Sequence, residues 1–262
     1  MIESRANPHV KHIRSLAADR KDRRRERLFV LEGVRLVADA LLGGALLDLV
    51  LYAPDQLTPT LAGQALLDQL ETLAVAHPAS ALVVAAASDT IHPQGVVALA
   101  HWPQIDPGVP GIILVLDAIQ DPGNMGTLLR SAEAVGVAEV LCATGAVDVY
   151  SPKVVRAAMG AHMRLAIAQD LSWDAISERL ALVDQVYAAD AEASMPYFAA
   201  DWRQPSALII GNEAHGLSED ARMLARSPIG IPMHGRTESL NAAVAGSVIL
   251  FEALRQRTRG RT

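Results

Sequence analysis

The chain has 262 residues, of which 51% are hydrophobic and 4% aromatic, and its formal net charge is −6. This length suits one large domain or two modest ones, and an apolar fraction made mainly of Ala, Val and Leu favours an α/β fold over a β-sandwich. The single cysteine, Cys142, excludes an internal disulfide and a multi-cysteine zinc site. Met1 is followed by charged and polar residues, and no apolar run reaches the roughly 18 residues of a membrane span, so we expect a cytoplasmic protein that does not enter a membrane.

The amino-terminal segment is basic, although the chain as a whole is acidic. Residues 1–36 carry ten Lys or Arg against five Asp or Glu, a local charge of +5 that leaves −11 for the rest of the chain. A basic end on an acidic protein suggests that a polyanion docks there, and a solvated helical face is the alternative interpretation. Arginine outnumbers lysine in this segment, which favours bidentate contacts with phosphate groups.

Short helices and strands alternate through the first hundred residues. Hydrophobic periodicity predicts helices over residues 8–25, 34–44 and 61–76, and strands over residues 28–33, 46–54 and 81–88. Residues 101–111 contain three prolines and two glycines, a composition typical of a linker. We therefore predict two domains, residues 1–104 and residues 105–262.

The alternation becomes regular after the linker. We predict strands over residues 112–116, 139–143, 163–168, 185–189, 207–211 and 227–231, and helices over residues 125–135, 152–159, 173–182, 218–225 and 240–257. Apolar strands separated by helices indicate a parallel sheet that is covered on both faces. Ligands of such a sheet bind at the carboxyl ends of its strands.

Polar loops follow several of these strands. The first, PGNMGTLLR, has Asn124 where a helix N-cap is expected and Arg130 in the helix that follows. The second, GNEAHGL, places Glu213 between Gly211 and Gly216 at a strand end, where glycine allows close approach of the backbone. Such a carboxylate is well placed to accept hydrogen bonds from a ligand or a neighbouring loop.

A third loop follows Pro232 and leads through Ser239, the expected N-cap, and Asn241 into a mainly apolar helix. None of the three loops is a dinucleotide fingerprint or a phosphate-binding P-loop, which disfavours a nicotinamide-dependent dehydrogenase. The eight histidines show no metal-ligand spacing, so we expect no metal.

Taken together, the three loops resemble the motifs of the SpoU (TrmH-type) RNA ribose 2′-O-methyltransferases of the SPOUT superfamily. The matching residues, in chain order, are Asn124, Gly126, Arg130, Gly211, Glu213, Gly216, Leu217, Ile231, Pro232, Met233, Ser239, Leu240 and Asn241. The resemblance covers about residues 108–257, and it departs from many relatives in lacking a second serine after Asn241. Residues 4–41 resemble the ribosomal-protein-like α/β substrate-binding domain that precedes many such catalytic domains and binds structured RNA.

The resemblance implies S-adenosylmethionine as methyl donor, a deep trefoil knot in the carboxy-terminal domain, and a homodimer formed through that domain. An RNA substrate is implied, because the accepting ribose 2′-hydroxyl is absent from DNA. The two-domain layout favours 23S ribosomal RNA. A tRNA substrate and a non-catalytic RNA-binding ribosome assembly factor are the alternatives.

The resemblance also assigns site residues. The catalytic set is Arg130, Asn124, Glu213, Ser239 and Asn241. The methyl donor would lie against Ala189, Asp190, Ile210, Gly211, Asn212, Glu213, Ile231, Pro232, Met233, Ser239, Leu240 and Asn241. RNA would be bound by Arg130 and by basic residues of the amino-terminal segment, Arg5, Lys11, Arg14, Arg23, Arg24, Arg25 and Arg35. The tail arginines Arg255, Arg257, Arg259 and Arg261 would either add phosphate contacts or form a solvated terminus.

The role of Arg130 follows from its chemistry. The corresponding arginine has been considered as the base, but a guanidinium, with a pKa above about 12, is a poor proton acceptor. We expect Arg130 to clamp an RNA phosphate and to stabilise the developing alkoxide instead.

Overall fold

A computed structural model of the chain describes residues 1–108, 111–235 and 239–259. Two compact units divide the chain: unit 1 is Met1–Pro103 with Tyr150–Met163, and unit 2 is Gln104–Val149 with Arg164–Thr262. The division into domains 1–104 and 105–262 stays a prediction, and residues 150–163 pack with unit 1. No helix in the described part of the chain is both long enough and apolar enough to cross a membrane.

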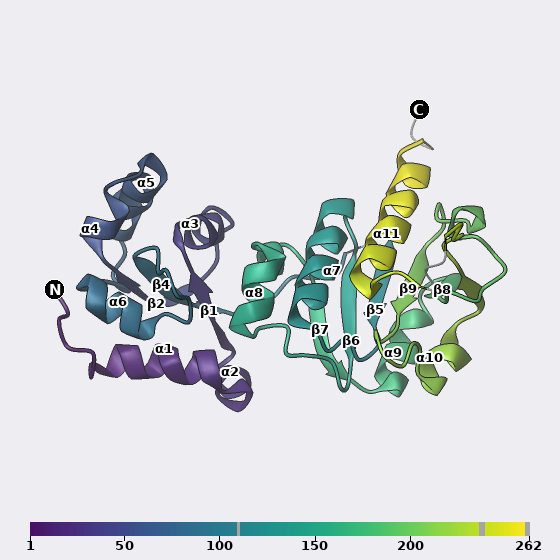
Figure 1. Cartoon of the computed structure of the whole chain (residues 1–262), viewed down its shortest axis with the longest axis horizontal. Coiled ribbons are helices and arrows are strands. Elements are labelled where there is room, and N and C mark those ends of the chain that lie inside the picture. The colour runs from purple at the N-terminus through teal and green to yellow at the C-terminus, as the bar shows by residue number, and fades with distance from the viewer. Residues whose placement is uncertain (109–110, 236–238, 260–262) are drawn as a thin grey trace. The chain divides into compact units, whose positions relative to one another are not determined.

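Unit 1 is built on a sheet with the strand order β1-β4-β2-β3, of which Figure 1 labels β1, β2 and β4. β4 (Val96–His101) runs antiparallel to both β1 (Leu28–Glu32) and β2 (Leu47–Tyr52), and β3 (Ala76–Pro78) runs parallel to β2. Its helices are α1 (Pro8–Ala18), α2 (Arg20–Glu26), α3 (Val34–Leu42), α4 (Pro54–Leu57), α5 (Leu61–Leu70), α6 (Ala81–Ala87) and α8 (Pro152–Ala158). Aliphatic side chains of α1, α6 and the three longer strands form its core.

Two predictions for unit 1 were wrong. Residues 81–88 were expected to be a strand, but α6 spans most of them. Its buried residues, Val83, Val84 and Ala87, lie on one helical face, while Leu82 is exposed. The expected single helix over residues 8–25 is two helices, because Asp19 adopts an extended backbone and its side chain accepts a hydrogen bond from the Lys21 N–H.

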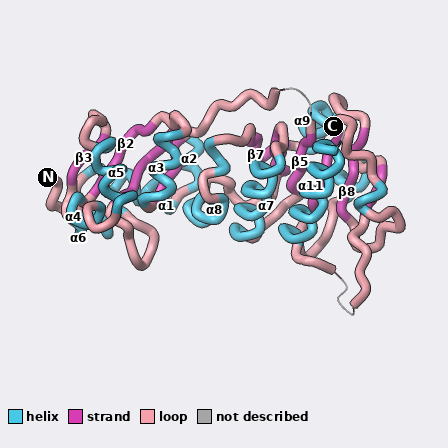
Figure 2. Tube along the Cα trace, turned by 90° about the horizontal axis from the view of Figure 1, so that it is seen from above, coloured by secondary structure: helices cyan, strands magenta, loops and turns pink. Residues whose placement is uncertain are grey.

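Unit 2 confirms the predicted parallel sheet, with the order β10-β8-β9-β5-β6-β7. The strands are β5 (Ile112–Leu116), β6 (Glu139–Ala143), β7 (Ile167–Leu171), β8 (Gln185–Ala189), β9 (Ser206–Ile210) and β10 (Ser227–Ile229). The helices are α7 (Pro122–Val135), α9 (Trp173–Leu180), α10 (Glu219–Leu224) and α11 (Ala242–Arg259). Figure 2 shows α7 and α11 on one face of the sheet and α9 on the other.

The start of one strand was predicted wrongly. The strand expected at residues 163–168 is β7 at Ile167–Leu171, and Ala161–Met163 forms a 3₁₀ turn, η1, that belongs to unit 1. The apolar Met163 side chain is buried in that turn, which explains why it read as part of a strand.

The strand order reverses at the centre of the unit 2 sheet. From β5 the chain moves outward through β6 to β7, and it then returns to build β8, β9 and β10 on the other side of β5. β5 therefore lies between β6 and β9. Because β5 and β9 are parallel neighbours, the loops that follow them begin side by side at the same edge of the sheet. In open α/β sheets this is the position where ligands bind.

α11 packs against α7 and runs in the same direction. The Ser131 hydroxyl of α7 lies 2.7 Å from the Ser247 hydroxyl of α11. A Cβ atom added to Gly246, the residue before Ser247, would lie 2.5 Å from Cδ2 of Leu128, which is about one turn before Ser131 on α7. The close approach at Gly246 brings the amino-terminal ends of the two helices together.

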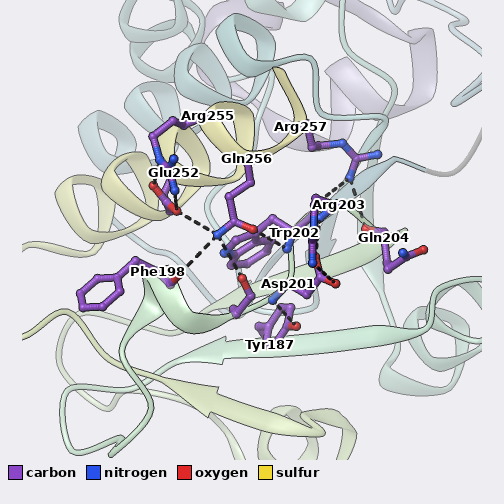
Figure 3. A network of polar contacts seen from close by, with 11 residues as sticks. Tyr187, Phe198, Asp201, Trp202, Arg203, Gln204, Glu252, Arg255, Gln256 and Arg257 are labelled. Carbon is purple, nitrogen blue, oxygen red and sulfur yellow. Dashed lines mark hydrogen bonds and ion pairs between the residues drawn. The ribbon is translucent and has the colours of Figure 1, made fainter. Parts of the chain in front are cut away.

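The other end of α11 holds the segment that precedes β9 (Figure 3). The Gln256 amide donates to the carbonyl of Ala200 at 3.1 Å, and its oxygen accepts from the Trp202 N–H at 3.1 Å. The Trp202 ring is fully buried and lies 4.7 Å from the Tyr187 ring of β8. α11 is thus fixed at both ends, by α7 near its start and by this segment near its end.

A larger side chain at Gly246 should separate α11 from α7. We expect Gly246→Leu to cost about 1–3 kcal/mol through overpacking, which lowers the midpoint of thermal unfolding by roughly 3–10 °C. Differential scanning calorimetry measures this change. Lys153→Leu, which adds the same side chain at an exposed helix position, is the control and should shift the midpoint much less; equal shifts would contradict the packing argument.

Candidate functional site

Three side chains from the three polar loops meet at the centre of the unit 2 sheet. The Asn124 amide nitrogen donates to Glu213 Oε1 at 2.7 Å, and the Asn241 amide nitrogen donates to Asn124 Oδ1 at 2.9 Å. Asn124 belongs to α7, Glu213 to the loop after β9, and Asn241 directly precedes α11. The predicted convergence of these three motif residues is therefore present as a hydrogen-bonded row.

The row has a defined polarity. Asn241 Oδ1 accepts from the N–H groups of Ala243 and Val244, at 2.9 and 3.2 Å, so its amide nitrogen must face away from α11. That nitrogen donates to Asn124 Oδ1, which in turn directs the Asn124 amide nitrogen toward Glu213. The amino-terminal end of α11 thereby orients one oxygen of an exposed carboxylate through two amides.

Both helix caps differ from the prediction. Asp121, and not Asn124, caps α7: its carboxylate accepts from the Asn124 N–H at 2.8 Å. Because Asp121 already occupies the cap, the Asn124 side chain is available for Glu213. At α11 the cap is Asn241 and not Ser239, since the Asn241 carbonyl accepts the N–H of Ala245 at 2.9 Å.

A second set of bonds, which the sequence analysis did not anticipate, joins the loops after β5 and β9. Asp117 is buried, and its Oδ2 accepts from the Ser218 N–H at 2.6 Å. The Asn212 amide nitrogen donates to the carbonyl of Ala118 at 2.7 Å, and Ala118 has a left-handed backbone with φ of 51°. An acid directly after the apolar run Ile112–Leu116 was the available sequence signal for Asp117.

The residues expected to hold the methyl donor lie at the ends of adjacent parallel strands. Ala189 is the last residue of β8 and Ile210 the last of β9, Asp190 and Gly211 follow them directly, and Ile231 follows β10. A Cβ atom at Gly211 would lie 2.5 Å from the carbonyl carbon of Gly216, so the β9 loop folds tightly back on itself.

The surroundings of these strand ends are mostly apolar. Ile231 and Leu240 are half-buried, and Pro232 and Met233 are exposed. The Asp190 carboxylate is held by Arg222 at 3.2 Å. Residues 236–238 of the third loop lie outside the described residues.

Two predicted catalytic residues do not join the row. Arg130 is exposed on α7, and six residues of helix place its Cα atom roughly 9 Å further along the axis than that of Asn124. Ser239 is exposed and lies two residues before the α11 cap. Neither side chain forms a hydrogen bond or ion pair with another of the residues that the structure describes.

The basic residues of unit 1 fall into two groups. Arg23 is buried, and its guanidinium donates to the carbonyls of Leu16 and Ala17 at 2.5 and 3.0 Å, so it stabilises the α1–α2 turn. The expectation that Arg23 faces solvent, where it would bind RNA, was wrong. Exposed side chains are found at Arg5, Lys11, Arg14, Arg24, Arg25 and Arg35. Lys11 and Arg14 lie on α1 opposite its buried face.

The acids of α2 are turned toward α1. The Ser15 hydroxyl donates to Asp22, and this bond is the chief reason that the pKa of Asp22 is lowered. His12 lies 2.5 Å from Glu26 and is the chief cause of the lowered pKa of that carboxyl. Both carboxylates also pair with Arg25 of α2, at 2.6 and 2.8 Å, and their partners within the described residues do not include Lys11 or Arg14 of α1.

The tail arginines are largely engaged within unit 2. Arg255 pairs with Glu252 at 2.6 Å, which raises the pKa of Arg255. Arg257 donates to the carbonyls of Trp202 and Gln204 at 3.1 and 3.3 Å, and partial burial lowers its pKa. The side chain of Arg259 and the whole of Arg261 lie outside the described residues.

Comparisons with known proteins find matches for both parts of the chain. The model of the SpoU rRNA methylase family matches residues 111–251, and that of the MRM3-like substrate-binding domain matches residues 7–98. The 23S rRNA (guanosine(2553)-2′-O)-methyltransferase RlmP of Bacillus subtilis (strain 168) is 30% identical over 252 residues, 95% of this chain and 97% of that protein.

Two solved structures show how far the likeness extends. The SpoU methyltransferase AviRb from Streptomyces viridochromogenes, in complex with AdoMet, is 29% identical with a TM-score of 0.85, covering 96% of this chain and 98% of that one. A structure concerned with 2-OH methylation of C/U34 on tRNA is 32% identical with a TM-score of 0.53. The match between the two covers 99% of the chain in that structure and 58% of this chain.

The two functions of Asn241, capping α11 and orienting Asn124, are separable by substitution. Asn241→Ala removes the cap and should cost about 0.5–2 kcal/mol, seen as a lower thermal midpoint. Asn241→Asp keeps the capping oxygen but loses the donor to Asn124, so its midpoint should stay close to that of the unchanged protein. A midpoint as low for Asn241→Asp as for Asn241→Ala would argue against Asn241 as the cap.

Proposed function

This chain belongs to the SpoU rRNA methylase family, and we propose that it transfers a methyl group from S-adenosylmethionine to a ribose 2′-hydroxyl of 23S rRNA. The observation that carries the proposal is the row Asn241–Asn124–Glu213, which unites residues of all three family motifs at the switch point of the sheet. Two amides and a carboxylate, fixed in orientation, suit the alignment of a neutral hydroxyl acceptor.

Relatives with whole-chain similarity favour ribosomal RNA over tRNA. RlmP and AviRb match this chain over both units, whereas the tRNA-related structure matches only 58% of it. RlmP and AviRb therefore match a larger part of this chain than the tRNA-related structure does. Residues 7–98 of this chain match a substrate-binding domain. We propose that unit 1 binds structured rRNA.

The strand ends of unit 2 fit S-adenosylmethionine. Adenine is flat and neutral, and the half-buried Ile231 and Leu240 beside glycine-containing loops offer apolar surface and backbone groups to hold it. When bound, S-adenosylmethionine supplies a methyl group that is already activated by its sulfonium. The residues of this chain then have to exclude water, hold the acceptor ribose and manage one proton.

Asn124, Glu213 and Arg130 divide these tasks in our proposal. Asn124 positions the acceptor ribose, and Glu213, whose Oε1 is occupied by Asn124, directs its second oxygen toward the RNA or an arginine. Arg130 binds the neighbouring phosphate and stabilises the developing alkoxide, because its guanidinium is exposed and can form a bidentate contact.

We further propose a trefoil knot and a homodimer for unit 2, and a cytoplasmic location. The return of α11 onto α7, an earlier helix, is consistent with a knotted connection. An apolar stripe on α11, formed by Val244, Val248 and Phe251, is 36–50% exposed and supports a second copy as its partner. The reducing cytoplasm suits the lone Cys142, whose burial raises its pKa to about 12 and keeps it a thiol.

The proposed reaction is tested with purified protein, labelled S-adenosylmethionine and 23S rRNA from a strain that lacks this protein. We expect label in a single ribose 2′-O-methyl group, located by mapping of methylated ribose, and no labelling of tRNA. Isothermal titration calorimetry of S-adenosylmethionine is the parallel measurement. Absence of binding with and without RNA would remove the enzymatic interpretation and favour a non-catalytic RNA-binding protein.

Arg130→Lys tests the bidentate clamp. Lysine keeps the charge but not the planar fork, so we expect kcat to fall by about 10- to 100-fold, with the affinity for S-adenosylmethionine unchanged. Single-turnover methylation rates measure the effect. Near-full activity of Arg130→Lys would contradict a bidentate contact with phosphate.

Removing the free charges of α1 should weaken RNA binding without changing stability. We expect the double variant Lys11→Gln, Arg14→Gln to lower the slope of log affinity against log salt concentration by about 2. Arg203→Gln with Arg255→Gln is the matched control, because it removes two arginines that are already paired with Asp201 and Glu252. Equal losses in the two double variants would point to net charge and not to the α1 face.

A further inference from the structure

We propose that Asp117 and Asn212 are positioning residues that hold the left-handed backbone of Ala118 and thereby set Asn124 against Glu213. The proposal rests on the methyl transfer proposed above, and it deepens that function by naming what preorganises the site. Neither side chain needs to touch the methyl donor or the RNA in this role.

The backbone at Ala118 is unfavourable by itself. Its φ of 51° is rare for a residue with a Cβ atom, and glycine adopts it readily. Such conformations persist where the surroundings hold them, and they gather at functional sites. Ala118 is the second residue after β5 and lies six residues before Asn124, so a change of its torsion would displace the start of α7.

Asn212 supplies one restraint. Its amide nitrogen donates to the Ala118 carbonyl at 2.7 Å, and its oxygen accepts from the N–H groups of Ala214 and His215 at 2.8 and 3.1 Å. Both ends of the amide are therefore used by the protein. These bonds tie the Glu213 loop to the loop of Ala118.

Asp117, which directly follows β5, supplies the second restraint, whereas Asn212 lies in the loop after β9. Its Oδ2 accepts from the Ser218 N–H at 2.6 Å, and its own N–H donates to the Ile210 carbonyl at 2.9 Å. The side chain is 3% exposed, so water competes little for this carboxylate. The two loops are thus bonded on both sides of Glu213, at Asn212 and at Ser218.

The geometry makes a specific prediction about rescue. If Asn212 acts by holding Ala118, a glycine at position 118 should make that restraint less necessary, because glycine carries no left-handed penalty. If the Asn212 side chain acts directly on the methyl donor or RNA, glycine at position 118 cannot replace it. Ala118→Gly therefore separates positioning from direct contact.

The experiment compares Ala118→Gly, Asn212→Asp and the double variant in single-turnover methylation of 23S rRNA. Asn212→Asp retains the oxygen that accepts from Ala214 and His215, so the turn is preserved, but it loses the donor to Ala118. We expect Asn212→Asp to lower kcat about 10-fold with KM changed less than about 3-fold, and the double variant to recover at least about 3-fold of that loss. Ala118→Gly alone should stay within about 2-fold of the unchanged protein.

A readout independent of catalysis accompanies the rates. The side-chain ¹⁵N–H₂ signal of Asn124 reports its bond to Glu213, and we expect it to shift in Asn212→Asp and to return in the double variant. Failure of glycine to restore either the rate or this signal would overturn the positioning role. If instead the unchanged protein methylates no RNA, the proposed function fails, while the Asn124 signal still decides whether Asn212 positions this residue.

Discussion

The parallel pairing of β5 with β9 is the constraint on which the site depends. Leu116 and Ile210, the last residues of the two strands, are register partners, so the loops that follow start at the same height on the sheet edge. One loop leads into α7 and the other toward α10. A shift of the register would separate Asn124 from Glu213 and break the bonds that Asp117 and Asn212 make between the loops.

The orientation of the polar groups in the row comes from a helix end and two amides, which act on the carboxylate of Glu213. Asn241 caps α11 with its side-chain oxygen, so its amide nitrogen donates to Asn124. This bond orients the amide of Asn124, whose nitrogen donates to Glu213. Each amide has one end fixed by a partner that cannot reverse its role, so the row has a single arrangement of donors and acceptors. An acceptor hydroxyl would meet groups that are already oriented, which reduces the entropy lost on binding.

The basic side chains of unit 1 differ in burial. Arg23 closes the turn between α1 and α2 and is part of the fold, whereas Lys11 and Arg14 stand on the exposed face of α1. Asp22 and Glu26 meet Ser15 and His12 between the helices and pair with Arg25 of α2. A count of charges along the sequence contains none of this, because it gives a buried arginine and an exposed one the same weight.

The sequence alone determined the parallel sheet of unit 2, because its strands are near-continuous apolar runs with polar loops at their ends, and it brought Asn124, Glu213 and Asn241 to one edge. It misassigned residues 81–88, where an Ala- and Val-rich run fits a short strand as well as a helix, and it missed β4, whose buried residues show no alternation. Only the tertiary structure decided which residues cap α7 and α11, that Arg23 is buried, and that Asp117 and Asn212 join two loops. The bonds of Asn212 and Asp117 join residues 94 and 101 positions apart, and the burial of Arg23 depends on a neighbouring helix, so local sequence carries no record of either. The caps are bonds over two or three residues, and there the structure decided which of the nearby candidate side chains makes them.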